Sequence, residues 1–355
     1  MKVPSRGPSP VMAVPWRSRI ALASALGILA GYRAYAMALA FPAHKDFTQV
    51  WFAAQAMLAG RNPYLLIGPG RAFEWNAPLF YPLPAAVILA PLAPLTEAVA
   101  GGIFMGVSGA CFAWALMRYG YAPVLGIFGA GFVTATESMQ WASLLSSAIV
   151  LTPLAAFWIA KPTIATAFFV ANPTRRALAW AVGGGLVFSL IAFAFQPQWP
   201  MHWLTALHAT RFERGQGNPY VPPVFMPWGF LVLAAAARWR RPEARLLAAL
   251  ACAPQTLLMY ESVPLFLIPR TWFESIGLVV LSYVANSQMV NTGVIGHDVD
   301  HSGRLLVLWL YLPATLMVLR RPNEGVVPAW LEARVAQWPG WVRGAPTRSE
   351  IPDAS

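Results

Sequence analysis

The sequence predicts an all-α, polytopic membrane protein. Hydrophobic residues make up 57% of the 355 residues, charged residues make up 11%, and the mean hydropathy is +0.53. A soluble domain carries about 25% charged residues. Long apolar segments recur along the whole chain, and arginines fall in short clusters between them. Because a crossing helix needs ~20 apolar residues, we expect about 10–12 spans.

The net charge of +11 is distributed in a way that argues against nucleic acid as a partner. A surface that binds nucleic acid is a contiguous solvated basic face. Here the basic residues lie between apolar segments, as in cytoplasmic loops that follow the positive-inside rule. The clusters are Arg17/Arg19, Arg175/Arg176, Arg238/Arg240/Arg241/Arg245 and Arg320/Arg321. We expect membrane lipids as partners and leave the oligomeric state open.

The basic clusters also divide the chain into three parts. Residues 1–19 and 321–355 are polar and basic and are expected in the cytoplasm, on either side of a transmembrane domain over 20–320. The first apolar segment is too long for the core of a signal peptide, so we interpret it as a retained span. Residues 42–79 and 196–223 are the two large polar loops on the external side. Cys111 and Cys252 lie inside apolar segments, which indicates neither a disulfide framework nor a metal site.

Most of the expected spans are plain apolar runs. They cover 20–41, 98–117, 121–136, 143–160, 177–195, 224–237, 246–258, 272–290 and 304–319. Residues 80–95 contain four prolines and fit either a bent span or a re-entrant element. A full span would place Glu137 and Gln140 inside and Lys161 outside, and a re-entrant element would reverse both. The positive-inside count favours the re-entrant element, because Arg118 and Lys161 then face the cytoplasm.

The segment from Asp46 to Tyr64 opens the first external loop. Its apolar residues recur at the period of one helix face, and Gly60, Asn62 and Pro63 end that helix. An amphipathic helix with a carboxylate at its N-terminus is therefore expected at the membrane edge. Gln49, three residues after Asp46, fits a capping box, so the carboxylate has a structural reading as well as a chemical one.

The order of motifs in this region resembles a known enzyme family. An Asp after the first span is followed by a Leu-x-Gly turn at Leu58–Gly60, by Asn62-Pro63-Tyr64, and by Phe80-Tyr81-Pro82. This order is similar to the polyprenyl-phosphate-dependent glycosyltransferases of the GT-C superfamily, most of all to glycosyltransferase family 87, which is mannosyltransferase-like. Partial matches follow at Gln140, at Lys161-Pro162 with Arg175-Arg176, and at Pro254-Gln255 with Tyr260-Glu261, where Glu stands in place of Asp.

The resemblance implies an inverting hexosyltransferase of the bacterial inner membrane, with its active site on the periplasmic or external face. It implies a hexose, mannose-like, transferred from a polyprenyl-phosphate donor to a hydroxyl of a lipid or glycan, with Asp46 as general base. The chemistry is feasible with one carboxylate, because the leaving group is a phosphate ester that needs no strong acid. No cofactor and no metal are expected.

Candidate binding residues accompany Asp46. For the donor phosphate and sugar we name Lys45, Arg61, Tyr64, Tyr81, His208, Arg211, Gln255, Tyr260 and Glu261. Arg71, Arg214 and His202 are further loop cations, each of which is equally interpretable as an interfacial residue near lipid headgroups. The late group His297, Asp298, Asp300 and His301 fits a divalent metal site or a solvated loop, and the loop is favoured.

Two other functions compete with the transferase. A transporter or flippase of lipid-linked sugars would need charged residues at mid-span, whereas most charges lie in loops. A catalytically inactive membrane protein that supports a complex fits the incomplete match at Gln140.

Overall fold

The computed structural model describes residues 14–41, 45–75, 77–213, 220–291, 299–325 and 327–339. This part of the chain is mostly helical, as predicted, with one parallel sheet of two short strands. The α-helices are α1 (Trp16–Ala40), α2 (Asp46–Leu58), α3 (Pro63–Leu66), α4 (Leu83–Leu89), α5 (Glu97–Leu116), α6 (Ala130–Glu137), α7 (Ala142–Ser147), α8 (Pro162–Ala171), α9 (Arg175–Phe195), α10 (Trp199–Glu213), α11 (Pro242–Cys252), α12 (Trp272–Asn291), α13 (Val299–Leu306), α14 (Leu312–Leu319) and α15 (Ala329–Val335).

Shorter elements connect these helices. The strands are β1 (Ile67–Gly68) and β2 (Phe73–Glu74). Tighter 3₁₀ turns form η1 (Ala90–Leu92), η2 (Met117–Tyr119), η3 (Ala122–Phe128), η4 (Thr152–Ala160), η5 (Pro223–Phe225), η6 (Gly229–Arg238) and η7 (Met259–Leu267), and η8 (Val307–Tyr311) is a π-helical segment.

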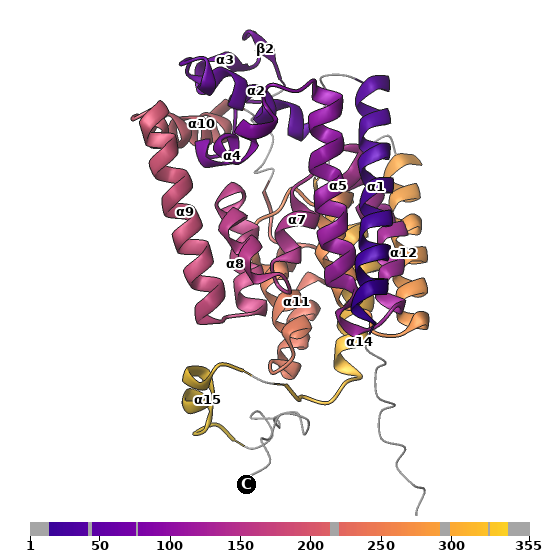
Figure 1. Cartoon of the computed structure of the whole chain (residues 1–355). Helices are drawn as coiled ribbons and strands as arrows, with labels where there is room; N and C mark the ends of the chain where they lie inside the picture. The colour runs from indigo at the N-terminus through magenta and orange to yellow at the C-terminus, as the bar shows by residue number, and fades with distance from the viewer. Residues whose placement is uncertain are drawn as a thin grey trace, which may run out of the picture.

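Four helical segments are long and apolar enough to cross a membrane: α1, Glu97–Tyr119, α9 and Asp300–Leu319. They match four of the expected spans. α1 and α5 lie side by side in Figure 1. Their contact is made of small residues: a Cβ added to Gly27 would lie 2.7 Å from the Gly106 carbonyl oxygen, and one added to Gly31 would lie 2.7 Å from that of Gly102. Such small-xxx-small pairs are typical of helices that associate within a bilayer.

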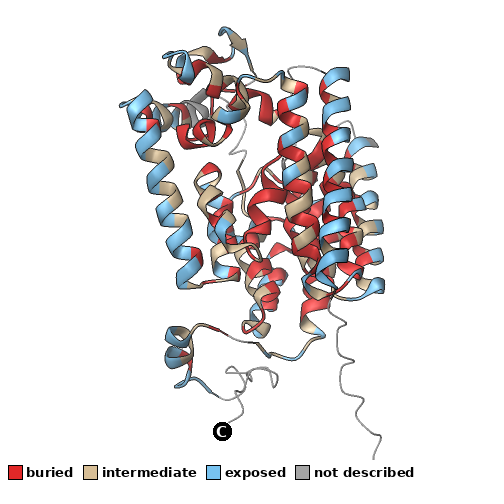
Figure 2. Cartoon of the chain, viewed as in Figure 1, coloured by how far each residue is buried: buried red, intermediate tan, exposed pale blue. Residues whose placement is uncertain are grey.

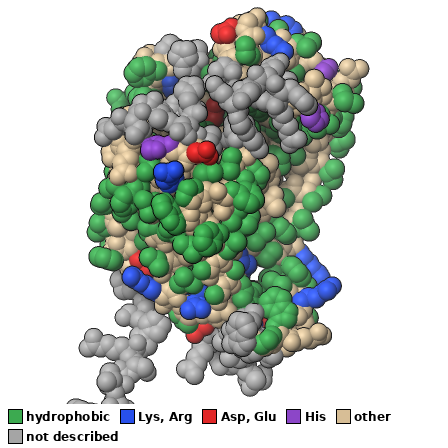
Figure 3. Space-filling view, turned by 180° about the vertical axis from the view of Figure 1, so that it is seen from behind, with side chains coloured by type: hydrophobic (Ala, Val, Ile, Leu, Met, Phe, Trp, Pro, Cys, Tyr) green, Lys and Arg blue, Asp and Glu red, His purple; other side chains and the backbone are tan. Residues whose placement is uncertain are grey.

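The outer faces of the long helices expose apolar side chains. Only 6% of the apolar window of α9 is buried, and Leu186 and Leu190 are 59% and 66% exposed. Figure 2 shows the buried residues gathered in the centre of the molecule and the exposed ones on α9 and the outer faces of α1 and α12. Hydrophobic side chains cover the middle of the face seen in Figure 3. An apolar surface of this extent is a binding surface, and lipid fits its composition.

The basic clusters gather at one end of the helices. Arg19 donates to the Trp114 carbonyl, Arg245 donates to the Ala171 carbonyl, and Arg270 lies over the Tyr119 ring at 4.1 Å. α2, α3, α4 and α10 lie at the opposite end (Figure 1). Each of the four apolar segments therefore has one terminus at the basic end of the molecule. Its other terminus lies at the end that carries the two large loops, 42–79 and 196–223.

Residues 80–95 do not form a full span. α4 and η1 together cover ten residues, Leu83–Leu92, which is too short for a crossing. Both ends of this segment stay beside the first loop: the Tyr81 carbonyl accepts from the Tyr64 hydroxyl, and the Leu92 carbonyl accepts from Trp51. This geometry agrees with the re-entrant interpretation.

Residues 143–160 do not form a span either, which corrects the expected topology. Lys161 Nζ lies 2.9 Å from Gln140 Oε1, so the intervening segment, α7 and η4, leaves from and returns to one level. A crossing would separate its two ends by ~30 Å. Gln140 and Lys161 therefore lie together beside the first loop, whereas the favoured parity put them at opposite ends of the helices.

Three further expected spans are built from shorter pieces. Residues 121–136 become η3 and α6, residues 224–237 become η6, and residues 246–258 become α11 followed by extended chain. α12 covers the expected segment 272–290 with twenty helical residues. In the expected C-terminal tail, α15 is fastened by Glu332, which accepts from Arg240 at 2.7 Å.

Candidate functional site

The helix α2 carries the central residue, Asp46, at its first position. The chain forms α2 as predicted, with Phe47, Val50 and Met57 fully buried and the helix ending at Leu58 before Gly60, whose φ is +68°. Glycine adopts this left-handed conformation at no steric cost, which explains the stop. The buried face fixes the helix, and its N-terminus places Asp46 half-buried at the edge of the core.

The expected capping box does not form. Lys45 occupies the N-cap position, and no side chain accepts a hydrogen bond from the first backbone N–H groups of α2. Asp46 accepts from other side chains instead: its Oδ2 from Gln140 Nε2 and its Oδ1 from Gln49 Nε2, the latter at 3.4 Å. The carboxylate is thus oriented by amides and keeps further acceptor positions.

One phenylalanine positions Asp46 and Gln140 together. Phe47, which follows Asp46, packs on the Phe104 ring of α5 at 5.2 Å, and Trp141, which follows Gln140, packs on the same ring at 5.0 Å. Because both neighbours are anchored on one ring, two segments 94 residues apart meet in a fixed register. Phe47 and Trp141 are completely buried.

A chain of polar contacts extends from Asp46 through Gln140. The Gln140 amide donates to Asp46 with its nitrogen and accepts from Lys161 Nζ with its oxygen, at 2.9 Å. Lys161 Nζ lies 4.0 Å from Glu261 Oε1. The Lys161 side chain is 19% exposed and the Glu261 side chain 8%. One cation is therefore linked to Glu261 directly and to Asp46 through Gln140.

Two tyrosines flank the lysine. The Tyr81 and Tyr260 rings each lie 5.6 Å from Lys161 Nζ, within cation–π range. Thr256 joins the same group and donates to Glu261 Oε1 at 3.2 Å. Burial raises the pKa of the Tyr81 phenol well above its ordinary value, and the nearby Asp46 carboxylate raises it further. Tyr81 thus stays a neutral hydrogen-bonding group beside Asp46.

Strained backbone adjoins the site at two positions. Met139 has φ of +51° and Leu257 has φ of +54°, and they stand next to Gln140 and Thr256 in the chain. Both side chains are completely buried. Non-glycine residues hold this conformation only where the surroundings impose it, and such positions concentrate at functional sites.

Three candidates from the first loop lie elsewhere. Lys45 is buried, and its ammonium donates to the Met37 and Phe41 carbonyls at the end of α1, where burial lowers its pKa. Arg61 follows the far end of α2, ~20 Å along the helix from Asp46, and is exposed. Tyr64 supports the site indirectly through its bond to the Tyr81 carbonyl at 3.1 Å. Arg71 donates to the Tyr64 carbonyl.

The later candidates also divide. Tyr260 and Glu261 belong to the site, whereas Gln255 is buried and bonds to the Leu250 carbonyl at 2.6 Å and to Tyr311. His208 is exposed on α10. On the same helix, His202 bonds to Asn62 at 2.9 Å. The side chain of Arg211 and all of Arg214, His297 and Asp298 lie outside what the structure describes. Among the described residues, no three His, Cys, Asp or Glu side chains are grouped as metal ligands.

Gln140 and Lys161 are the site residues that the sequence placed least well. Both belong to the partial matches of the resemblance described above. The span predicted over 143–160 also put the two residues at opposite ends of the helices. A sharper signal was available, because the chain has three lysines, at 2, 45 and 161, and Lys161 alone stands between two long apolar runs. Ionisable residues in such surroundings are a default sign of function.

Comparison with known proteins adds no relative: no family model, curated protein or solved structure matches the chain. The chemistry of the site therefore stands on its own geometry. A carboxylate with free acceptor positions, a partly exposed ammonium ion and two tyrosines can take a proton, hold an anion and stack against a sugar.

Proposed function

We propose that the chain is a membrane glycosyltransferase that moves a hexose from a polyprenyl-phosphate donor to a lipid or glycan hydroxyl, with inversion. One observation carries the proposal. The contacts of Asp46, Gln140, Lys161 and Glu261 join four segments that are distant in the sequence. The resemblance in the sequence points to these four residues. The packing that brings them together is an independent observation, because it was not used to choose them.

In the proposed reaction the acceptor oxygen attacks the anomeric carbon of the sugar. The bond from this carbon to the phosphate oxygen breaks, and its electron pair leaves with the polyprenyl phosphate. Asp46 takes the proton of the acceptor hydroxyl, because its carboxylate is held at the membrane-edge end of α2 and keeps acceptor positions open. Attack from the side opposite the leaving phosphate inverts the configuration.

Lys161 is the residue that stabilises the departing phosphate. Its ammonium group makes one hydrogen bond, to Gln140, and a long ion pair of 4.0 Å to Glu261. A cation that is incompletely paired can accept a new anion without breaking a strong contact. Gln140 joins this cation to Asp46 and fixes their spacing, while Tyr81 and Tyr260 form the walls beside them.

The surface of the molecule supports a membrane setting. The four apolar segments, the exposed face of α9 and the glycine contact of α1 with α5 all suit a bilayer. The basic end fits the cytoplasmic side under the positive-inside rule, and in this proposal the Asp46 end faces the exterior. In that orientation the start of α1 and the helix α15 both lie toward the cytoplasmic end (Figure 1).

The test is turnover of a synthetic polyprenyl-phosphate mannose by the purified chain in proteoliposomes, with release of free polyprenyl phosphate as the readout. We expect release that depends on an added acceptor lipid or glycan extract. If the donor stays intact but moves between leaflets, the chain is a flippase instead. If the donor stays intact and in place, the chain has no transferase role. Glu74→Gln serves as the matched control, because Glu74 is an exposed carboxylate in the same loop.

A further inference from the structure

Arg33 lies on an exposed, largely apolar side of α1. Its side chain is 47% exposed, and its neighbours Leu29, Tyr32 and Leu39 are 51%, 69% and 61% exposed. Its guanidinium makes an ion pair with Glu137 at 2.6 Å, and the Glu137 side chain is 32% exposed. Both charges therefore lie on the surface rather than in the core, next to side chains that suit a bilayer.

Arg33 lies within side-chain reach of the lipid headgroup layer, because a long arginine side chain can extend from the edge of the hydrocarbon core to the interface. α1 has 25 residues, a length of ~37 Å against a hydrocarbon core of ~30 Å. Arg33 comes seven residues before Ala40, about 10 Å from the end at which Asp46 follows. The exposed Tyr32 and Tyr35 beside it are the aromatic type that marks the interface.

A single tight turn links this ion pair to the candidate site. Glu137 is the last residue of α6, and three residues later Gln140 donates to Asp46. The turn is fixed by Met139, whose φ is +51°, and whose sulfur fills the space beside Gly101: a Cβ built there would meet it at 2.3 Å. The exposed Arg33–Glu137 ion pair and the half-buried Asp46 carboxylate are thus linked through one short turn.

We propose that Arg33 contacts the phosphate of a membrane-embedded lipid beside the Asp46 site. Glu137 holds the guanidinium in place, and the lipid phosphate binds the donors that Glu137 leaves unused. Glu137 occupies one nitrogen, Nη2, while a guanidinium has five N–H donors in a fork that suits phosphate oxygens. The inference rests on the proposed function for the identity of the lipid, a polyprenyl phosphate; bulk anionic phospholipid is the other source of the same chemistry.

The test is equilibrium binding of a radiolabelled short-chain polyprenyl phosphate to the full chain in phosphatidylcholine nanodiscs. We expect Arg33→Gln to weaken binding about tenfold, the loss of one charge-assisted contact. Glu137→Gln should bind at least as tightly as the wild type, because a competitor for the guanidinium is removed. Arg17→Gln, an exposed arginine at the other end of α1, should bind unchanged.

Three results would overturn the inference: unchanged binding by Arg33→Gln, an equal loss in Glu137→Gln, or no binding by the wild type. Displacement by equimolar phosphatidylglycerol would assign the contact to bulk lipid and remove its role for substrate. Should Arg33→Gln fail to fold, Arg33→Gln/Glu137→Gln removes both charges together and should show the same tenfold loss. Binding of the lipid needs no turnover, so Asp46→Asn should bind normally. A failed transferase assay would therefore not decide the outcome of the binding experiment.

Discussion

The two ends of the molecule both bury charged side chains, but they balance the charges differently. At the basic end, Glu243 is 3% exposed and lies 2.9 Å from both Arg270 and Arg321. At the other end, Lys161 is 19% exposed and lies 4.0 Å from its nearest carboxylate. A buried carboxylate surrounded by arginines connects neighbouring helices through ion pairs. A cation whose nearest carboxylate is 4.0 Å away is available to the phosphate of a substrate.

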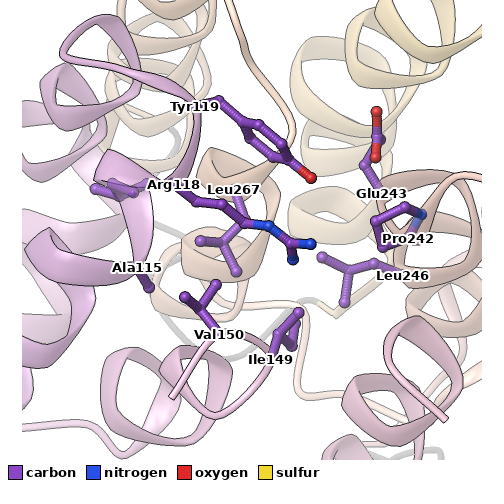
Figure 4. Close-up of a pocket in the computed structure, with 10 residues that line it drawn as sticks. Ala115, Arg118, Tyr119, Ile149, Val150, Pro242, Glu243, Leu246 and Leu267 are labelled. Atoms are coloured by element: carbon purple, nitrogen blue, oxygen red, sulfur yellow. The ribbon is translucent and has the colours of Figure 1, made fainter. Parts of the chain in front are cut away.

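The space beside Glu243 is small. The cavity there has a volume of about 20 Å³ and is lined by Arg118, Tyr119 and Glu243 among others. Arg118 extends its guanidinium across it, whereas the Glu243 carboxylate points away (Figure 4). This volume holds about one water molecule, not a sugar. We therefore interpret the Glu243 group as structural and the Asp46 group as functional.

The largest expected effect is on Asp46. Asp46→Asn keeps the shape and the bond from Gln140 but cannot accept a proton, so we expect transfer to fall by about 10²–10⁴-fold. The measurement is the initial rate of sugar transfer in proteoliposomes. Glu74→Gln in the same loop should stay within a factor of two of the wild type, about the scatter of surface substitutions. Comparable rates for the two variants would remove Asp46 from the mechanism.

Lys161 comes next. Lys161→Met removes the charge but keeps much of the apolar stem, and we expect a loss of about 10²–10³-fold in transfer, the usual effect of losing one electrostatic stabiliser. Lys161→Arg should retain more activity than Lys161→Met because it keeps the charge. If Lys161→Met instead lowers the melting temperature without slowing transfer, the lysine is a structural residue like those around Glu243.

Glu243 should show the opposite behaviour. Glu243→Gln leaves Arg241, Arg270 and Arg321 close together without their shared carboxylate, and we expect a loss of about 3–5 kcal/mol in the free energy of unfolding. A thermal melt in detergent measures the loss. Transfer per folded molecule should not change, and a loss of transfer at equal stability would contradict the structural role.

The smallest effect is expected at Glu332. Its side chain is 46% exposed, although its partner Arg240 is 1% exposed. Because solvent screens a half-exposed carboxylate, and because glutamine can still accept from Arg240, Glu332→Gln should cost about 1 kcal/mol or less. The same thermal melt decides this. A loss as large as that of Glu243→Gln would show that α15 is an essential part of the basic end.

The elements that the sequence predicted well are those fixed by local physics. The bounds of α2 follow from its apolar period and from Gly60, and the long helices α1, α5 and α9 follow from unbroken apolar runs. The return of residues 141–160 could not be predicted in this way. An apolar segment of that length has the same composition whether it crosses a bilayer or bends back inside the protein.

The candidate site was predicted in part for the same reason. Asp46, Tyr81, Tyr260 and Glu261 come from motifs and meet in the structure. Lys45, chosen for its residue type, and Gln255, from the same partial match as Tyr260 and Glu261, lie in contacts of their own. The meeting of Gln140 with Asp46 depends on tertiary packing around Phe104, which no local pattern encodes.

The central claim is that Asp46 accepts a proton in sugar transfer and does not merely hold the fold. The most direct measurement is the transfer rate per folded molecule of Asp46→Asn, with its melting temperature taken on the same preparation and compared with Glu243→Gln. The account predicts that Asp46→Asn loses transfer at an unchanged melting temperature. Retained transfer by Asp46→Asn, or a loss that only follows a fall in melting temperature as in Glu243→Gln, would contradict it.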